Sequence, residues 1–202
     1  LILSDEIYSE LSFEKNFQSI SNYYPEKTII STGLSKWCGA GGWRLGYFVM
    51  SESLNKLRDS LKVLASETFS SVSAPIQYAA IAAYNNDHSE YINNSKNILK
   101  AVGEYVYNNL KSNNIIINKP QGGFYLMPEF VNKNFSSSDE MCSDILKKTG
   151  VALLPGSDFG FSKNKMIVRL SFTDFDGHTF MKNVSDTENI DDNLISRFAP
   201  NI

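Results

Sequence analysis

The 202-residue sequence contains only two cysteines and two histidines. Cys38 and Cys142 are too few for a disulfide framework, and with His88 and His178 they form no convincing zinc-ligand spacing. We therefore expect no metal site. Because chains without a disulfide framework are typical of reducing compartments, we also expect a cytoplasmic protein.

Long apolar runs and an excess of basic charge are also missing. The hydrophobic stretches are far shorter than the roughly 20 residues of a membrane-spanning helix. A net charge of -3 without any basic run gives no reason to expect nucleic acid or an anionic membrane as a partner. What remains is an ordinary globular composition, 42% hydrophobic and 20% charged.

The first third of the chain has the pattern of an α/β sheet. It begins on the apolar run LILSDEIY, which resembles a buried strand over residues 1–4, and two further strands are predicted at 28–31 and 43–50. Because a buried parallel strand needs neighbours on both sides, we expect this chain to be the C-terminal part of something longer.

Helical patterns follow. The leucines of residues 54–64 recur at three- and four-residue steps after Ser51, a plausible N-cap, and Pro75 suits the first turn of a helix over 75–86. A longer helix is predicted at about 89–111, within a connecting segment of about 88–112. Its apolar stripe is Leu99, Val102, Val106 and Leu110.

The last third predicts a separate α+β lobe. Short strands are expected at 115–118, 123–130, 151–155 and 166–173, with one helix over 138–150 and a partly helical segment after Asp176. We therefore expect two domains, residues 1–85 from a mostly parallel sheet and residues 86–202 as a complete small domain.

Asp5 and Tyr8 are the first candidates for chemistry. They stand at the C-terminal end of a predicted parallel strand, where open α/β sheets bind ligands. The alternative is that Asp5 caps a loop and Tyr8 fills the edge of the core.

Lys36 lies at the equivalent end of the next strand, among glycine, leucine, serine and tryptophan. A partly buried lysine amine can attack an aldehyde and form a Schiff base. The alternative is a surface lysine in a flexible loop. Cys38 lies two residues further on and is interpreted as a small filler rather than as a redox group.

Arg44 follows Lys36 by eight residues, across a loop rich in glycine. Its forked cation, the Ser35 hydroxyl and nearby backbone N–H groups are suited to holding a phosphate, since glycines let the backbone turn closely around such a group. An ion pair at the start of a strand is the alternative for Arg44.

These motifs together closely resemble the class I/II aminotransferases of the aspartate aminotransferase fold, fold type I, which depend on pyridoxal 5′-phosphate (PLP). The resemblance is carried by the order and spacing of DEIY, SK and GWRLGY, and it continues through GGFYLMPEF, GVALLPGSDFG and VRLSFT to cover nearly the whole chain. It implies an α/β fold consisting of the C-terminal part of that enzyme, with part of the large-domain sheet and a complete small domain.

The resemblance implies a role for each matched residue. Lys36 would form the Schiff base with PLP and later move the proton, Asp5 would pair with the pyridine nitrogen, and Tyr8 would hydrogen-bond the ring oxygen. Ser35 and Arg44 would bind the phosphate. Arg169 would bind the substrate α-carboxylate in a bidentate pair. Phe124 and Tyr125 either shape the substrate pocket or belong to the core of the small lobe.

The resemblance also implies contacts from outside the matched half. In the family, the N-terminal half supplies a phosphate loop, an aromatic ring that stacks on the cofactor and an asparagine, and a second subunit of a homodimer completes the site. We therefore expect this chain alone to bind PLP weakly or not at all, and not to transaminate at a useful rate. One departure is Gly33, where many relatives carry serine; Ser35 or Ser31 is expected to compensate.

Three other functions stay open. A PLP-dependent β-lyase would share the cofactor residues, because the pocket and not the cofactor chooses which bond breaks. The effector domain of an aminotransferase-like transcription regulator would follow a DNA-binding domain. A globular α/β fragment without a ligand is the third. Amino acid and 2-oxo acid substrates are expected for the enzyme, without a prediction of which ones.

Overall fold

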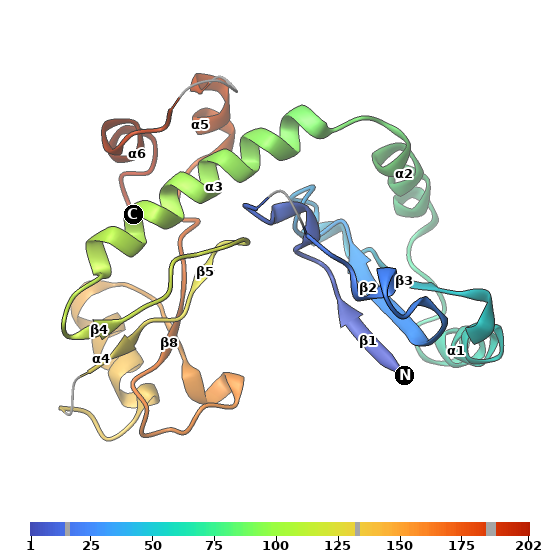
Figure 1. Cartoon of the computed structure of the whole chain (residues 1–202), viewed down its shortest axis with the longest axis horizontal. Coiled ribbons are helices and arrows are strands. Elements are labelled where there is room, and N and C mark those ends of the chain that lie inside the picture. Colours follow the sequence, from blue (N-terminus) through green and yellow to red (C-terminus); the bar gives the residue numbers. More distant parts are fainter. Residues whose placement is uncertain (15–16, 132–133, 185–188) are drawn as a thin grey trace. The chain divides into compact units, whose positions relative to one another are not determined.

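A computed structural model describes residues 1–14, 17–131, 134–184 and 189–202. The chain forms two compact units, residues 1–92 and 93–202, and the boundary falls within helix α3 (Ser89–Leu110) (Figure 1). The predicted domain boundary at residues 85 and 86 stays a prediction. None of the helices in the described part of the chain has the length and apolarity of a membrane span.

Unit 1 contains a three-stranded sheet in the order β1 (Ile2–Asp5), β2 (Thr28–Gly33) and β3 (Gly46–Met50). Strands β1 and β2 are parallel, and Asp5 stands opposite Ser31. Strand β3 is antiparallel to β2, with Gly46 opposite Gly33. We expected a mostly parallel sheet, and the antiparallel pair arises because the short loop 34–45 holds no crossover helix that a parallel return would need.

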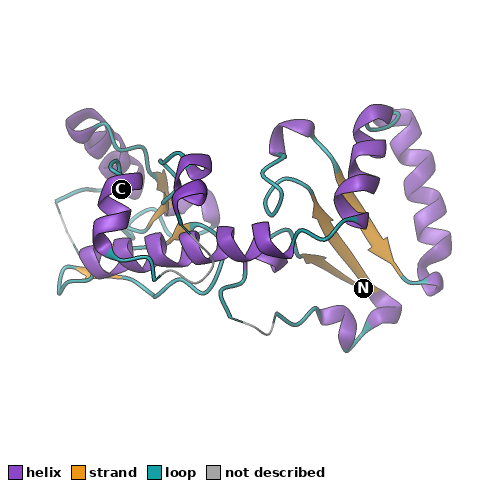
Figure 2. Ribbon diagram, turned by 90° about the horizontal axis from the view of Figure 1, so that it is seen from above, coloured by secondary structure: helices purple, strands orange, loops and turns teal. Residues whose placement is uncertain are grey.

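The connections and helices of unit 1 agree with the sequence pattern in part. The helices predicted after Ser51 and from Pro75 are both present (Figure 2). The first one begins at Asn55 and not directly after Ser51, because a 3-10 turn occupies residues 52–54 and Ser51 makes no side-chain cap hydrogen bond. The third strand begins at Gly46 and not at Trp43, because a short turn occupies residues 41–43. The remaining elements are the 3-10 turns η1 (Ser9–Leu11), η2 (Ile20–Asn22), η3 (Pro25–Lys27), η4 (Gly41–Trp43) and η5 (Glu52–Leu54), and the helices α1 (Asn55–Thr68) and α2 (Ala74–Asn85).

The core of unit 1 lies under the loop after β2. Leu34, Trp37 and Leu45 are buried and pack with Ala80 of α2. This packing holds both ends of the loop that carries Lys36 and Arg44. The chain between Leu34 and Leu45 is therefore fixed by its own buried side chains.

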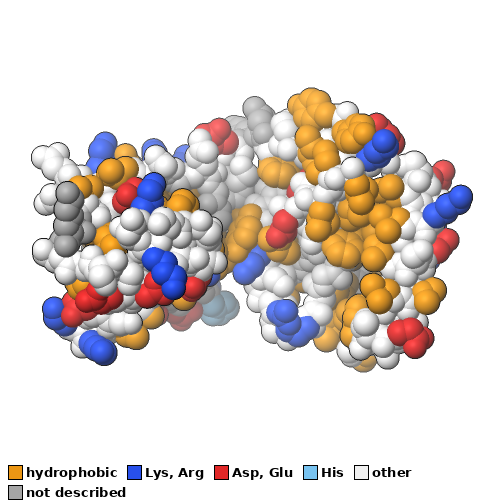
Figure 3. Space-filling model, turned by 90° about the horizontal axis from the view of Figure 1, so that it is seen from below, with side chains coloured by type: hydrophobic (Ala, Val, Ile, Leu, Met, Phe, Trp, Pro, Cys, Tyr) orange, Lys and Arg blue, Asp and Glu red, His pale blue; other side chains and the backbone are white. Residues whose placement is uncertain are grey.

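Much of the apolar surface of unit 1 is exposed (Figure 3). Leu1 and Leu3 are 73% and 65% exposed, and Val63 of α1 is 65% exposed. The expectation that residues 1–4 form a buried strand is therefore wrong for this chain. Within the described residues β1 pairs only with β2, so one edge of the strand has no neighbour to cover it.

Unit 2 is built on two small antiparallel sheets, β4 with β6 and β5 with β8 and β7 in the order β5-β8-β7. Its elements are α3, β4 (Ile115–Ile116), β5 (Tyr125–Leu126), β6 (Glu129–Phe130), α4 (Ser138–Thr149), β7 (Leu154–Pro155), the 3-10 turn η6 (Gly156–Phe159), β8 (Val168–Ser171), α5 (Gly177–Asn183) and α6 (Asp192–Phe198). The predicted α+β lobe is confirmed.

Two apolar clusters form the core of unit 2. The larger one joins α3 to the C-terminal helices through Val102, Phe172, Phe180 and Ile195, all of them buried. The smaller one lies under α4 and includes Met141, Cys142 and Val168. Val168 is fully buried in β8, so the next residue of that strand, Arg169, points to the other face of the sheet.

Candidate functional site

Asp5 and Tyr8 mark the C-terminal end of β1. Because β1 and β2 are parallel and Asp5 stands opposite Ser31, the two strands end at the same edge of the sheet. The Asp5 carboxylate is exposed there and accepts a hydrogen bond from the Ile7 N–H at 3.2 Å. Tyr8 follows at the start of η1, where its carbonyl accepts from the Leu11 N–H at 2.9 Å.

A buried carboxylate fixes this strand end, and the sequence patterns did not identify it. The Oε1 atom of Glu6 accepts hydrogen bonds from the Ser19 hydroxyl at 2.7 Å and from the Ser4 hydroxyl at 3.0 Å. The Glu6 N–H donates to the carbonyl of Ser31 at 2.9 Å, which continues the β1–β2 pairing by one residue. Glu6 therefore ties β1, β2 and the intervening connection together directly between Asp5 and Tyr8.

Lys36 lies close to Tyr8, as its position after β2 predicts. Its Nζ atom is 5.5 Å from the centre of the Tyr8 ring. The lysine is half-buried, and two residues close to it in the sequence, Leu34 and Trp37, are buried. Its carbonyl accepts from the Gly39 N–H at 3.3 Å, so the loop turns directly after the lysine. The structure thus brings Lys36, Tyr8 and Asp5 to one edge of the sheet.

Arg44 adopts an unusual backbone conformation, with φ of 57° and ψ of 43°. This left-handed region costs a residue other than glycine on the order of 1–3 kcal/mol. Its Nη1 atom donates to the carbonyl of Gly41 at 2.7 Å, which secures the turn. Since a guanidinium has five N–H groups, this bond leaves donors for an anion.

Ser35 and Arg44 lie on either side of Gly41. A Cβ atom on Gly41 would lie 3.5 Å from the Ser35 carbonyl oxygen, so the two segments of the loop are in contact. The loop closes through the Leu34 N–H, which donates to the carbonyl of Leu45 at 3.3 Å. The candidate phosphate residues are thus held in one small, glycine-containing loop beside Lys36.

Gly33 has a structural reason to be glycine. A Cβ atom at this position would lie 2.5 Å from the carbonyl oxygen of Leu45 and 2.9 Å from the Cα atom of Gly46. A serine here would collide with backbone, which has little freedom to move. The hydroxyl groups nearest to Gly33 in the sequence are those of Ser31, Thr32 and Ser35.

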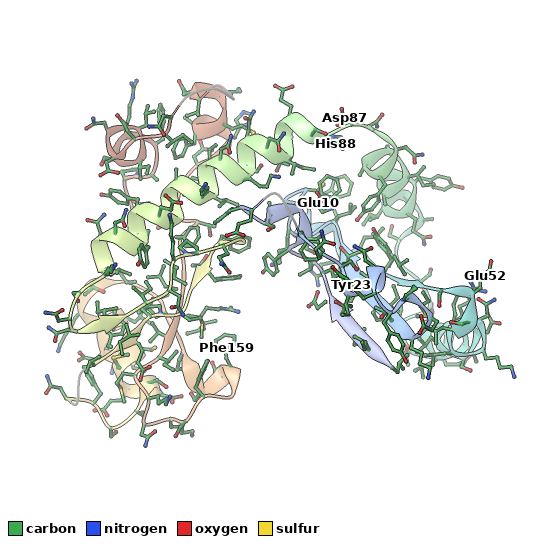
Figure 4. The ribbon with its side chains drawn as sticks, viewed as in Figure 1. Glu10, Tyr23, Glu52, Asp87, His88 and Phe159 are labelled. Atoms are coloured by element: carbon green, nitrogen blue, oxygen red, sulfur yellow. The ribbon has the colours of Figure 1, made fainter. Side chains whose placement is uncertain are left out.

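Arg169 belongs to unit 2. It is half-buried in the middle of β8, opposite Leu154 of β7. Its guanidinium carbon is 4.4 Å from the centre of the Tyr125 ring and 4.5 Å from the centre of the Phe159 ring. Phe159, labelled in Figure 4, was not identified from the sequence; its position as the one large apolar side chain in PGSDFG is the signal that could have drawn attention to it.

Thiol and metal chemistry receive no support from the described residues. Burial raises the pKa of the Cys38 thiol above its ordinary value, and burial does the same for Cys142. A raised pKa keeps both thiols protonated and weakly nucleophilic near neutral pH. In the described part of the chain, no three histidine, cysteine, aspartate or glutamate side chains gather in a group that could hold a metal ion.

Comparison with known sequences gives a consistent result. Residues 1–177 match the family described as "Aminotransferase class I and II". The chain is 36% identical over 171 residues to a probable N-acetyl-LL-diaminopimelate aminotransferase of Bacillus subtilis (strain 168), which covers 85% of this chain and 42% of that protein. It is 34% identical over 181 residues to an aspartate aminotransferase of the same organism, and this match covers 85% of this chain and 44% of that protein.

Solved structures show the same likeness. An alanine aminotransferase from Pyrococcus furiosus superposes with a TM-score of 0.75 at 31% identity, over 84% of this chain and 44% of its own. An aspartate aminotransferase from Thermotoga maritima superposes with a TM-score of 0.70 at 31% identity, over 84% of this chain and 42% of its own. These likenesses confirm the predicted fold class. The chain spans less than half the length of the relatives that it matches.

Proposed function

Since the chain belongs to the family of class I and II aminotransferases, we propose that it is the C-terminal half of a PLP-dependent enzyme that transfers the amino group of an L-amino acid to a 2-oxo acid. The names of its relatives, aspartate, alanine and N-acetyl-LL-diaminopimelate aminotransferase, support this reaction type. Their different substrates leave the amino donor open. A reaction of this type belongs to amino acid metabolism.

The observation that carries the proposal is the edge of the unit 1 sheet. A lysine amine, a phenol ring and an exposed carboxylate come from the ends of two adjacent parallel strands, with Nζ of Lys36 5.5 Å from the Tyr8 ring centre. A few residues away, Ser35 and Arg44 flank Gly41. These groups suit a ligand that carries an aldehyde, a pyridine ring and a phosphate. The amine is complementary to the aldehyde, the carboxylate and the phenol to the ring, and the hydroxyl and guanidinium to the phosphate.

PLP supplies, when bound, an aldehyde and a ring that draws electrons from the substrate Cα atom. Lys36 would hold that aldehyde, and its amine would then move the proton at Cα. Asp5 would stabilise a proton on the ring nitrogen by charge pairing, and Tyr8 would donate a hydrogen bond to the ring oxygen. Ser35 and Arg44 would hold the phosphate, and Arg169 would orient the substrate by its α-carboxylate.

The complete site needs more than this chain. We propose that the longer protein forms a homodimer, and that residues outside the matched half complete the contacts to PLP. For the 202-residue chain alone, micromolar PLP is expected to give no stable absorbance of bound cofactor and no useful turnover. Robust transamination by the isolated chain would contradict that view. A cytoplasmic location is part of the same proposal.

Amino transfer in the full-length protein tests the proposed function. The expected result is transfer that requires a 2-oxo acid and is lost in Lys36→Ala, together with the visible absorbance of bound PLP. Release of ammonia and pyruvate without an oxo acid would establish a β-lyase instead. Bound PLP without any turnover, in a protein with an upstream DNA-binding domain, would establish a regulator.

A further inference from the structure

Arg169 makes two aromatic contacts that come from separate elements. Its guanidinium carbon lies 4.4 Å from the ring centre of Tyr125 on β5 and 4.5 Å from the ring centre of Phe159 on η6. Both distances are well inside the roughly 6 Å range of a cation–π contact. All three residues belong to unit 2, so the arrangement is internal to one compact unit.

Strand pairing accounts for the position of Tyr125. Tyr125 stands opposite Ser171 in the antiparallel β5–β8 pair. Because side chains alternate along a strand, Arg169 and Ser171 share a face, and Tyr125 is therefore the diagonal neighbour of Arg169, within reach of long and aromatic side chains. The Phe124 ring centre lies 4.6 Å from that of Tyr125 and supports it.

A tightly fixed turn accounts for the position of Phe159. The Gly156 N–H donates to the carbonyl of Ile167 at 2.8 Å, and a Cβ atom on Gly156 would lie 2.9 Å from that same oxygen. The Ser157 hydroxyl donates to Asp139 of α4 at 3.0 Å, and Gly160 ends the turn with φ of +83°. The turn is thus anchored to Ile167, directly before β8, and to α4, while Phe159 stays 40% exposed.

We propose that Tyr125 and Phe159 are positioning residues that hold the Arg169 guanidinium ready to receive a carboxylate. Contact with the rings restricts the long side chain before any ligand binds, so less conformational freedom is lost when a carboxylate pairs with it. A cation–π contact depends on the charge of the guanidinium and requires none of its N–H groups, so the forked pair with a carboxylate can still form. That the carboxylate belongs to the amino acid substrate rests on the proposed function; the aromatic contacts do not.

Side-chain NMR of the 202-residue chain tests the positioning directly. With ¹⁵N-labelled arginine, the Nε–Hε signal of Arg169 is assigned by its loss in Arg169→Lys. The expected result is a rigid signal with a ring-current shift that becomes mobile and loses its shift in Phe159→Leu and in Tyr125→Leu. Phe161→Leu is the matched control, because Phe161 is 42% exposed in the same loop and makes no contact that the proposal uses. An unchanged signal in Phe159→Leu, or an equal change in Phe161→Leu, would overturn the proposal.

Kinetics of the full-length protein test the purpose of the contacts. Phe159→Leu is expected to raise KM for the amino donor about tenfold, with kcat changed less than about threefold, as for a contact worth about one factor of ten in binding. A mobile Arg169 with an unchanged KM would contradict a role in carboxylate binding. If the wild-type protein transferred no amino group, the proposed function would fail, while the NMR result would still decide whether the rings position Arg169.

Discussion

At the scale of single residues, Lys36, Tyr8 and Glu6 define the end of the unit 1 sheet where the candidate site lies. The order of DEIY, SK and GWR placed Lys36 after the second strand, and the structure brings its amine to 5.5 Å from the Tyr8 ring centre. Glu6 was not found, although it lies inside the same motif, because its importance depends on Ser19, which reaches it only in the folded chain. Phe159 was also missed, because its contact with Arg169 forms only when η6 and β8 come together in the folded chain.

Gly33 offers a prediction at this scale. Gly33→Ser is expected to lower the free energy of unfolding of unit 1 by about 1–3 kcal/mol, because the new side chain would overpack against the backbone of Leu45 and Gly46. Urea denaturation followed by tryptophan fluorescence measures this, since both tryptophans, Trp37 and Trp43, lie in unit 1. Gly42→Ser is the control.

A Cβ atom on Gly42 would meet no atom of the described residues within 4 Å, apart from its own chain neighbours. Gly42→Ser is therefore expected to change the free energy of unfolding by less than about 0.5 kcal/mol. Equal stability of the Gly33→Ser and Gly42→Ser chains would show that the backbone of Leu45 and Gly46 can move to accommodate a side chain at little cost in free energy. The steric reason for glycine at position 33 would then be wrong.

Glu6 offers a second prediction. Glu6→Ala removes a buried carboxylate that accepts two serine hydroxyls, and it is expected to cost about 1.5–3 kcal/mol of unfolding free energy in unit 1. Glu10→Ala, an exposed glutamate on η1 that is labelled in Figure 4, serves as the control and is expected to change little. The same fluorescence measurement applies. A loss no larger than that of Glu10→Ala would mean that Glu6 does not fix the strand end.

At the scale of elements, the sequence predicted those whose ends carry local signals. Helix α4 was expected at 138–150 and is observed at Ser138–Thr149, since Ser137 caps its start and Gly150 ends it with φ of +77°. Strand β3 was predicted to begin too early, because the apolar Trp43 suggested a strand where Arg44 turns the chain. The burial of β1 was also predicted wrongly, since local pattern does not reveal which strands lie beside it.

The start of α4 predicts a dependence on pH. Hydrogen bonds from the hydroxyl and the N–H of Ser136 hold the pKa of Glu140 below its ordinary value of 4.5. A lowered pKa means that this carboxylate stabilises the folded state above about pH 4.5 and that the stabilisation is lost as the pH falls through the lower, folded-state pKa. NMR titration of the Glu140 carboxyl carbon is expected to show a midpoint below 4.5.

Glu140→Gln is the matched variant for this prediction. The difference in stability between the wild-type chain and Glu140→Gln should shrink as the pH is lowered through that range. A Glu140 midpoint at or above the ordinary value of 4.5 would show that the Ser136 hydrogen bonds do not persist in solution.

At the scale of the whole molecule, the sequence predicted the family, the fold and the presence of two lobes. The resemblance covered nearly the whole chain, and the family match extends over residues 1–177. The amino donor could not be predicted, because it depends on pocket residues beyond the cofactor chemistry that the family shares. Unit 1 also keeps apolar side chains exposed, which agrees with a chain that spans less than half the length of its relatives.

The central claim is that this chain supplies the lysine that holds PLP. The most direct measurement is borohydride reduction of the full-length protein with PLP, followed by peptide mass spectrometry. We expect one stable phosphopyridoxyl adduct on Lys36, and no adduct in the same peptide of Lys36→Ala. An adduct confined to another lysine, such as Lys27 before β2, or no adduct at all, would contradict the claim.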